Sequence, residues 1–386
     1  MKNILYFIPS LSTSGGMERV LTEKVNYLAN KGCYQIFIVT TEMSDYAIPF
    51  FDLNSAVNVI NLKLCFNDKF NLNIFDKILE TKKLLKKYEE ELKKIILIKE
   101  IDICISMGGK ELEFLGGLSV PCKKIYECHF EKKFKSKFLE LQGKNNFLWK
   151  LFGRLRDWQH FLLASKFDMV VVLSDGAAQD WAKLSNPVLI VANPSPIPLN
   201  MELEINLSSK RIISIGNLIT VKGYDLLISA WALIAQRYPE WSLDIFGKGE
   251  LHNDLQNQVN CLMLTNSIRL AGTTKDVKSE LKKSSFYVMS SRSEGLPMVL
   301  IESITCGLPI VAFDCETGPR EIIQDNDCGI LVENGNVEKL ALNIERMILD
   351  TELRKEMSIK ALEKSKKYEL TYIMEKWKKI FQELVR

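Results

Sequence analysis

The chain has 386 residues, of which 47% are hydrophobic, so it is long enough for two domains that each bury a core. Its formal net charge of +3 is close to neutral and predicts no nucleic-acid partner. The nine cysteines form no C-x-x-C pair and no cysteine–histidine metal spacing, and no apolar run reaches the about 18 residues of a membrane-spanning helix. The apolar run after Met1 is too short for a signal peptide, so we expect a cytoplasmic protein with reduced thiols.

The first half of the chain alternates short β-branched runs with longer helical patterns. Strands are predicted from NILYFIP, YQIFIVTT, IDICISM, KKIYECH and DMVVVLS, with an amphipathic helix after the first of them and a charged one over residues 73–95. This alternation is typical of a parallel sheet covered by helices.

Residues 122–156 contain ten Lys or Arg residues against three Glu residues, a local net charge of +7. The stretch continues as a helix with Leu148, Phe152, Leu155 and Leu162 on one face. One interpretation buries this face in the core and leaves the lysines solvated. The other lays residues 122–162 weakly and reversibly on an anionic membrane, with Trp149, Trp158 and the phenylalanines as anchors.

The second half repeats the α/β rhythm after a proline-rich stretch, VANPSPIPLN. Its predicted strands are RIISIGN, WSLDIFGKG, SIRLAG, SFYVMSS and PIVAFD, and helical pattern fills the tail from residue 336. We therefore predict one α/β domain over residues 1–195 and another over 205–365. We expect the last helix, 366–386, to cross back to the first domain.

Two glycine-rich turns join a strand to a helix. Gly15 and Gly16 allow positive φ and bare N–H groups at a helix start, which favours anions, although such a pair is also common in ordinary turns. Gly216 ends a strand, and Lys222 precedes the next helix, where it either reaches a phosphate or is a solvated loop residue.

Glu294 and Glu302 flank the start of another helix, in SEGLPMVLIES. Glu294 lies at the carboxyl edge of the second sheet, where ligands bind in open α/β folds. Gly295 permits close approach of a ligand, and Pro297 suits a first helical turn. Two hydroxyl-binding carboxylates beside an anion site suit a sugar–diphosphate–ribose ligand. The alternative is that Glu294 caps the helix and Glu302 is solvated or paired.

The stretch SRSEGLPMVLIESITCGLPIVAFDCETGPREII resembles the E-x7-E block of the retaining family-four glycosyltransferases, which have the GT-B fold. Further blocks are similar in the same order: SGGMERVL, VVVLSDGAAQDW, VANP, VKGYDLLISAW, LDIFGKGEL and IRLAGTTKDV. The resemblance implies an α/β fold of two Rossmann-like domains whose parallel sheets face across a cleft. It also implies retaining transfer of a sugar from a nucleotide donor, with no cofactor and no obligatory metal.

The resemblance assigns roles by position. Lys222 neutralises the donor diphosphate, Glu294 contacts the donor sugar, and Glu302 binds the ribose hydroxyls. His129, which alone among the three histidines ends a strand of the first domain, is the candidate at the reacting sugar, with structural burial as its alternative. The remaining donor contacts are Gly15, Gly16, Val277 beside the base, and the backbone of Gly295, Leu296, Pro297, Met298 and Val299.

One position departs from the family pattern, in which an arginine often follows the glycine of the second loop. Here that donor-binding position is Asn217, which leaves one cation at the diphosphate unless Lys248 substitutes.

The expected activity is transfer of a hexose or N-acetylhexosamine, with UDP as the expected nucleotide, to a glycan acceptor that is lipid-linked. Such an enzyme builds capsule, lipopolysaccharide or another surface polysaccharide at the inner face of the plasma membrane. A GT-B sugar-nucleotide epimerase and a sugar-nucleotide-binding pseudo-enzyme stay as alternatives, and Asn217 is the feature that favours the second.

Overall fold

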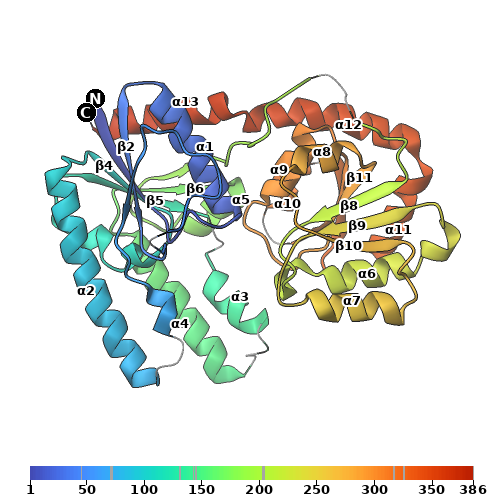
Figure 1. The fold of residues 1–386 in the computed structure, drawn as a ribbon, viewed down its shortest axis with the longest axis horizontal. Coiled ribbons are helices and arrows are strands. Elements are labelled where there is room, and N and C mark those ends of the chain that lie inside the picture. The colour runs from blue at the N-terminus through green and yellow to red at the C-terminus, as the bar shows by residue number, and fades with distance from the viewer. Residues whose placement is uncertain are drawn as a thin grey trace. The chain divides into compact units, whose positions relative to one another are not determined.

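The computed structural model describes residues 1–44, 46–69, 73–129, 132–141, 143, 146–201, 205–315, 318–324 and 327–385. The chain divides into two compact units, one formed by Met1–Pro194 with Ile373–Arg386 and the other by Ser195–Tyr372. Each unit is a parallel sheet covered by helices (Figure 1). The first unit thus contains all but the first three residues of the final helix, Leu370–Leu384, as well as the first half of the chain.

The sheet of the first unit has the strand order β3-β2-β1-β4-β5-β6-β7, and its pairings are parallel. Its central strands are covered on both faces, which is why they read as continuous apolar runs. The strand β3 was not predicted, because its four residues, NVIN, are half polar and lie at a partly exposed edge. The strands are β1 (Lys2–Phe7), β2 (Tyr34–Thr40), β3 (Asn58–Asn61), β4 (Ile103–Ser106), β5 (Lys123–Cys128), β6 (Met169–Val172) and β7 (Val188–Ile190).

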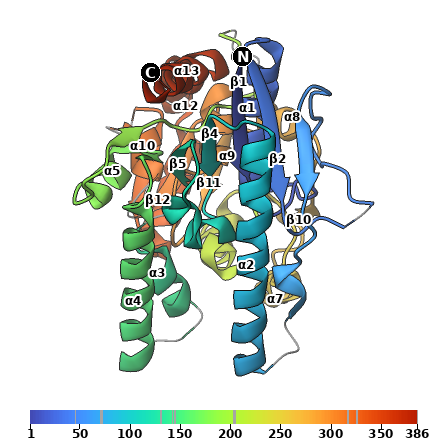
Figure 2. The same cartoon turned by 90° about the vertical axis from the view of Figure 1, so that its left-hand side faces the viewer.

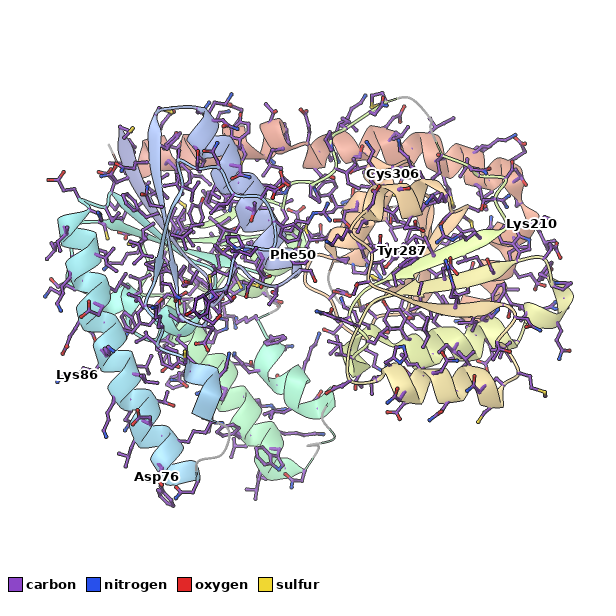
Figure 3. All side chains as sticks on the ribbon, viewed as in Figure 1. Phe50, Asp76, Lys86, Lys210, Tyr287 and Cys306 are labelled. Carbon is purple, nitrogen blue, oxygen red and sulfur yellow. The ribbon has the colours of Figure 1, made fainter. Side chains whose placement is uncertain are left out.

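Two helices of this unit, α2 and α4, extend beyond the sheet (Figures 1 and 2), and Asp76 marks the far end of α2 (Figure 3). Each starts at an asparagine whose side chain accepts a backbone N–H, from Asp76 in α2 and from Trp149 in α4. The helical segments are α1 (Gly16–Asn30), η1 (Phe66–Lys69), α2 (Ile74–Ile98), η2 (Lys110–Glu113), η3 (Leu115–Gly117), α3 (Phe134–Leu141), α4 (Phe147–Ala164), α5 (Asp175–Trp181) and α13 (Leu370–Leu384). Among the described residues, no helix is both long and apolar enough to cross a bilayer.

A buried ion pair joins three elements of the first unit. The Nζ atom of Lys24, on α1, lies 2.7 Å and 2.6 Å from the two carboxylate oxygens of Glu127, on β5. The same ammonium lies 3.8 Å from the ring centroid of Trp377, on α13. Burial alone would raise the pKa of Glu127, but the charges of Lys24 and His129 outweigh it and lower that pKa to about 2. The pair is therefore charged at neutral pH and ties α13 to the sheet.

The sheet of the second unit has the order β10-β9-β8-β11-β12-β13, again with parallel pairings. The edge strand β13 was not predicted, although Ile330, Leu331 and Val332 form an apolar run there. The strands are β8 (Arg211–Ile215), β9 (Ser242–Phe246), β10 (Ile268–Gly272), β11 (Phe286–Met289), β12 (Ile310–Asp314) and β13 (Gly329–Glu333).

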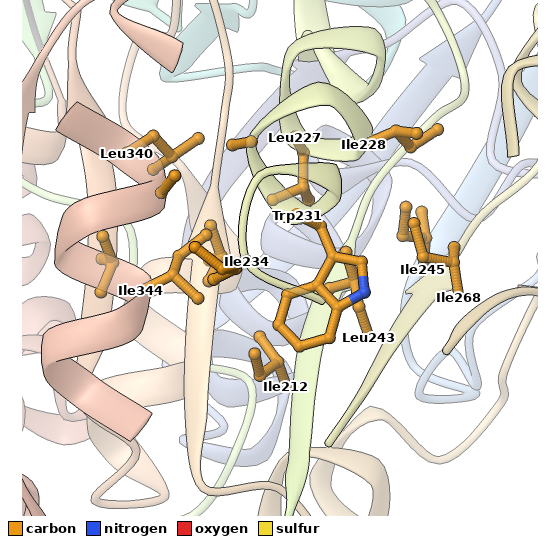
Figure 4. Close-up of a cluster of buried hydrophobic side chains, with 14 of the residues drawn as sticks. Ile212, Leu227, Ile228, Trp231, Ile234, Leu243, Ile245, Ile268, Leu340 and Ile344 are labelled. Atoms are coloured by element: carbon orange, nitrogen blue, oxygen red, sulfur yellow. The ribbon is translucent and has the colours of Figure 1, made fainter. Parts of the chain in front are cut away.

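Trp231 fills the core on one face of this sheet (Figure 4). It packs with Ile212 and Leu243 of the strands and Ile344 of α11, and its indole Nε1 donates to Ser267 Oγ at 3.0 Å. The helical segments are η4 (Thr220–Lys222), α6 (Tyr224–Ala232), η5 (Ala235–Arg237), α7 (His252–Cys261), α8 (Val277–Lys282), α9 (Met298–Thr305), α10 (Pro319–Ile322), α11 (Val337–Leu349), α12 (Thr351–Ser365) and η7 (Lys366–Tyr368).

The buried pair gives a stability prediction. Replacing Lys24→Met leaves the Glu127 carboxylate buried without its ammonium, so we expect the free energy of unfolding to fall by about 3–5 kcal/mol. Urea unfolding measures this loss, with Lys31→Met, an exposed lysine at the end of the same helix, as the control. A loss below about 1 kcal/mol would contradict the assignment. Because the folded pKa of Glu127 is depressed, its contribution is present above pH about 4.3 and disappears as the pH falls towards 2.

Candidate active site

The loop after β8 is pressed against the end of β11, and a glycine makes this approach possible. Gly223 follows Lys222 and has φ 63°, in the left-handed region. A Cβ atom at this position would lie 2.1 Å from the carbonyl oxygen of Ser290. Only glycine therefore allows the loop to lie where it does.

Polar contacts fix the same loop, residues 220–223, to residues 290–292, and we call the two segments together the clamp. Ser290 Oγ donates to the carbonyl of Lys222 at 3.1 Å, and the Arg292 amide donates to the carbonyl of Val221 at 2.8 Å. The Arg292 guanidinium binds the carboxylate of Asp225, at the start of α6, through two hydrogen bonds of 2.9 Å and 2.6 Å. The backbone of Lys222 is thus held from two sides.

The clamp brings together two residues that are 72 positions apart in the sequence. Lys222 Nζ donates to Glu294 Oε1 at 2.6 Å, and Ser291 Oγ donates to the same oxygen at 2.6 Å. The side chain of Lys222 is 27% exposed and that of Glu294 is 11% exposed. The interpretation of Lys222 as a solvated loop residue is therefore wrong, and both groups lie within reach of a ligand.

The helix α9 begins directly after this pair. Its N-cap is Pro297, and among the described residues no side chain caps it, so the interpretation of Glu294 as a helix cap is wrong. The carbonyl of Pro297 accepts the amides of Leu300 and Ile301, while Met298 and Val299 stand in the first turn, whose N–H groups have no partner within a helix. Gly295 to Val299 thus form the kind of helix start that binds anions.

Glu302 lies one helical turn inside α9 and is buried, so it is not a solvated helix residue. Burial, and after it the Glu302 carboxylate, raises the pKa of the Cys306 thiol to about 12. Within this unit Glu302 shares the helix that starts at the candidate anion site.

Asn217 is exposed and lies beside a second loop. The amide of Leu218 donates to the carbonyl of Lys248 at 2.9 Å, and the amide of Gly216 donates to the carbonyl of Phe246 at 2.9 Å. A Cβ atom at Gly247 would lie 1.9 Å from the Gly216 carbonyl oxygen, so the two loops are in backbone contact. This contact holds the exposed Lys248 next to the position where the family often has arginine. Val277, the remaining predicted contact of this unit, is half-buried and opens α8 behind the capping residue Asp276.

The glycine pair of the first unit differs from its prediction. Gly15 is the N-cap of α1 with φ −72° and ψ 159°, and Gly16 is the first helical residue, so neither position needs a left-handed backbone. The extended N-cap conformation is open to all residues, which explains the difference. Gly15 provides no side-chain cap for α1, and the carboxylate of Glu18, in the first turn, lies against this glycine.

His129 follows β5 and is buried beside Glu127. Its Nε2 atom lies 3.2 Å from Glu127 Oε1, without a well-aligned hydrogen bond among the described residues. Glu127 thus lies between Lys24 and His129, a connection that the sequence analysis did not find. The sequence Glu127-Cys128-His129 could have indicated this proximity, because residues i and i+2 of a strand point to the same face of the sheet. In the described part of the chain, no group of three His, Cys, Asp or Glu side chains has the arrangement of a metal site.

Residues 200–364 match the family model of glycosyl transferases group 1, a range that includes Lys222, Glu294 and Glu302. A glycosyltransferase of Haemophilus influenzae, itself uncharacterized, is 29% identical over 98% of this chain and 100% of its own length. A Campylobacter jejuni 4-α-N-acetylgalactosaminyltransferase, named for a diphospho-undecaprenol substrate, is 32% identical over 43% of this chain and 45% of its own length. The chain spans only 24% to 49% of three other curated relatives.

The fold has close counterparts among solved structures. A mutant of Staphylococcus aureus TarM, in complex with fondaparinux, α-GlcNAc-glycerol and UDP, superposes with a TM-score of 0.77 over 99% of this chain and 100% of that chain. The two chains are 17% identical, so the likeness concerns the fold, and it confirms the predicted two-domain α/β GT-B fold. The family model thus matches less than half of the chain, all of it within the second unit, and both curated relatives described above are named as glycosyltransferases.

Proposed function

We propose that the protein transfers a hexose or N-acetylhexosamine from a UDP-sugar to a lipid-linked glycan in the synthesis of a surface polysaccharide. Transfer proceeds with retention and needs no metal. The observation on which the proposal rests is the Lys222–Glu294 pair beside the uncapped start of α9. UDP occurs in the complex of the structural counterpart, and relatives are named for polysaccharide and polyol-phosphate substrates.

The pair and the helix start have complementary chemistry for such a donor. The ammonium of Lys222 and the first N–H groups of α9 offset the charge of a diphosphate, and this charge grows when the glycosidic bond to the leaving group breaks. Glu294 has the acceptor oxygens that sugar hydroxyls need. The clamp holds the Lys222 backbone in place before the donor arrives, so little reorganisation accompanies binding.

The other donor contacts rest on the resemblance alone. Glu302 is proposed for the ribose hydroxyls, Val277 for the base, and Gly15, Gly16 and His129 for the donor from the first unit. Lys248 is proposed to supply the cation that Asn217 lacks, because the two loops are in backbone contact.

A donor screen tests the activity itself. UDP- and GDP-sugars are added to the full chain, with thermal shift and hydrolysis as readouts, and the anomeric form of the transfer product is determined by NMR. Donor-dependent hydrolysis and a retained anomer support the proposal. An epimerised sugar without acceptor indicates the epimerase, and binding without any turnover indicates the pseudo-enzyme.

Replacing Lys222→Ala should weaken UDP binding by about tenfold to a hundredfold, because a charge-assisted contact is worth roughly 1.5–3 kcal/mol. Glu294→Gln should lose most transfer and keep the fold, since Glu294 is not a core residue. Calorimetry with UDP and transfer assays measure the two effects. The matched control is Lys210→Ala. Lys210 is exposed and directly precedes β8, whereas Lys222 lies in the loop after β8 (Figure 3). Unchanged UDP affinity in Lys222→Ala would exclude its diphosphate role.

The transfer activity should be retained when metal ions are removed by a chelator. The charges that a metal would offset are met by Lys222 and the helix start, so we expect nearly full activity in EDTA. The assay compares initial rates in EDTA, in buffer and after addition of Mn²⁺. Complete loss in EDTA with recovery in Mn²⁺ would show that the reaction needs a metal.

The acceptor proposal is supported by an exposed apolar face on α4. Eight of its large apolar side chains are 38% to 78% exposed in the structure, so their interpretation as core is wrong for these residues: Phe147, Leu148, Trp149, Leu151, Phe152, Leu155, Trp158 and Leu162. Lys150, Arg154 and Arg156 are exposed on the same helix. Phe130, Glu131, Gln142, Lys144 and Asn145 of the segment 122–162 lie outside the described residues. We propose that this helix rests weakly on an anionic bilayer.

Flotation with liposomes measures this association. The protein should float with vesicles that contain anionic lipid, at low salt, and less so at high salt, because each Lys or Arg near the surface contributes only about 1 kcal/mol. Leu155→Ser/Trp158→Ser should abolish flotation, whereas Leu342→Ser/Leu349→Ser, an exposed apolar pair on α11, should not. Equal loss in both variants, or no flotation of the unchanged protein at low salt, would refute the surface role.

A further inference from the structure

The first unit contains a cavity of about 250 Å³ that none of the predicted site residues lines. It lies where β1, β2 and β4 end, at Ile8, Thr41 and Gly108, and is walled by α2 and α4. The carboxyl edge of a parallel sheet is where ligands bind in open α/β folds. Its volume is below the about 300–1,000 Å³ of sites for drug-sized ligands, so it suits one sugar ring better than a longer oligosaccharide.

Three cations from three different elements line this cavity: Lys110 of η2, Lys135 of α3 and Arg156 of α4. Among the described residues, neither Lys135 nor Arg156 has a carboxylate within ion-pair distance of its charged atoms, and Lys110 has Glu113 only at 3.9 Å. Burial, and then the charges of Arg156 and Lys110, lowers the pKa of Lys135. Lys135 and Arg156, which repel each other and have no carboxylate at ion-pair distance among the described residues, favour an anion between them, and Lys110 lies beside them with part of its charge offset by Glu113.

The carboxylates of the cavity are already engaged. Glu111 is buried and accepts Ser106 Oγ at 2.7 Å and the Gly109 amide at 3.0 Å, and burial raises its pKa. Glu42 accepts the amides of Phe66 and Asn67, at 3.0 Å and 3.2 Å. Glu111 and Glu42 therefore hold the loops of the cavity. The third lining carboxylate, Glu113, lies 3.9 Å from Lys110, so Lys135 and Arg156 are the cations that the acids leave for a ligand.

A neutral polar pair and aromatic side chains complete the cavity. The Tyr126 hydroxyl and His160 Nε2 lie 2.7 Å apart, and burial, followed by the charges of Lys135 and Arg156, lowers the pKa of His160 to about 4. His160 is thus neutral at pH 7 and suits hydroxyl groups rather than an anion. Phe66 and Phe134 add apolar wall, as sites for sugar rings commonly have.

The helix α4 presents two faces with different chemistry. Arg156, Gln159, His160 and Leu163 line the cavity at helical spacing. Leu151, Leu155, Trp158 and Leu162 form the exposed apolar face. An acceptor whose apolar chain lies along the second face would have its polar end close to the first.

We propose that this cavity binds the phosphate-bearing end of the acceptor, with one sugar ring inside and its phosphate or diphosphate on Lys110, Lys135 and Arg156. This inference rests on the proposed function, because it names the acceptor class of the same enzyme. The shared chemistry is a sugar or polyol joined to phosphate, and its two sources are a lipid diphosphate and a polyol-phosphate polymer.

The first experiment needs no turnover. Inorganic pyrophosphate is titrated calorimetrically into the full chain bearing Lys222→Ala, which weakens the donor phosphate site. We expect Lys135→Gln/Arg156→Gln to weaken binding by about tenfold or more. The matched control is Lys133→Gln/Arg154→Gln, which removes the same charge from exposed neighbours that do not line the cavity. Absent pyrophosphate binding, or equal losses in the two double variants, would overturn the proposal.

The second experiment distinguishes the sources. Acceptor KM is compared for a saccharide diphospholipid in vesicles, a polyol-phosphate oligomer and a phosphate-free glycan. We expect Lys135→Gln/Arg156→Gln to raise KM about tenfold for one of the two phosphate-bearing acceptors, and that acceptor is the source. KM for the phosphate-free glycan and the affinity for UDP should stay unchanged. The control variant loses the same charge, so it corrects for attraction to the vesicle. A uniform change in KM for all acceptors would contradict the proposal. If no donor is turned over, the proposed function fails, while pyrophosphate binding still tests the cavity.

Discussion

The close approach of Gly223 to the carbonyl of Ser290 is the constraint on which the geometry of the candidate active site depends. Parallel strands place their carboxyl ends at one edge of a sheet, but this alone leaves loops free to point in many directions. The contact at Gly223, together with Ser290 Oγ and the Arg292–Asp225 pair, removes that freedom for Lys222. Glu294 follows the other half of the clamp after one intervening residue. A lysine and a glutamate from distant segments are thereby held at ion-pair distance before any ligand binds.

Two lysine–glutamate pairs of the molecule, Lys24–Glu127 and Lys222–Glu294, have different roles because they differ in burial. Lys24 and Glu127 are both 1% exposed, so each charge depends on the other, and no ligand can exchange for either partner without unfolding of the surrounding elements. Lys222 is 27% exposed, so its ammonium still has donors open to an incoming phosphate while Glu294 holds it in place. The buried pair thus holds α1, β5 and α13 of the first unit together. The pair of the second unit is partly exposed, so a ligand can reach the Lys222 ammonium while the surrounding fold stays intact.

The sequence predicted the parallel α/β architecture well, because central strands such as β1 and β12 are short apolar runs between long helical patterns. Of the edge strands, β3 was not predicted because half of its residues are polar, whereas β13 was overlooked although Ile330, Leu331 and Val332 form an apolar run. At the candidate site, the residue types near Glu294 and Lys222 were readable, but their contact was not, because it depends on backbone approach between distant loops. Gly15 does stand at a helix start as predicted, but the residue type alone could not show that its φ is −72° rather than positive. The cavity lined by Lys135, Arg156 and His160 left no motif, because its residues come from six or more separate segments.

The small net charge of the whole chain does not show that one segment, residues 122–156, is strongly positive. The formal charge of the whole chain is +3, whereas residues 122–156 alone have +7, which leaves −4 for the rest. On α4, positive charge and exposed apolar surface occur together, and exposed apolar patches of this kind mark interaction sites on soluble proteins. A purely ionic surface would attract any polyanion, and a purely apolar one would favour self-association. Their combination beside a cavity with a neutral histidine, aromatic walls and basic side chains suits the acceptor that we propose, which carries an apolar chain, a phosphate and a sugar in that order. The acceptor that we propose would therefore be recognised by side chains of the first unit, whereas the Lys222–Glu294 pair belongs to the second.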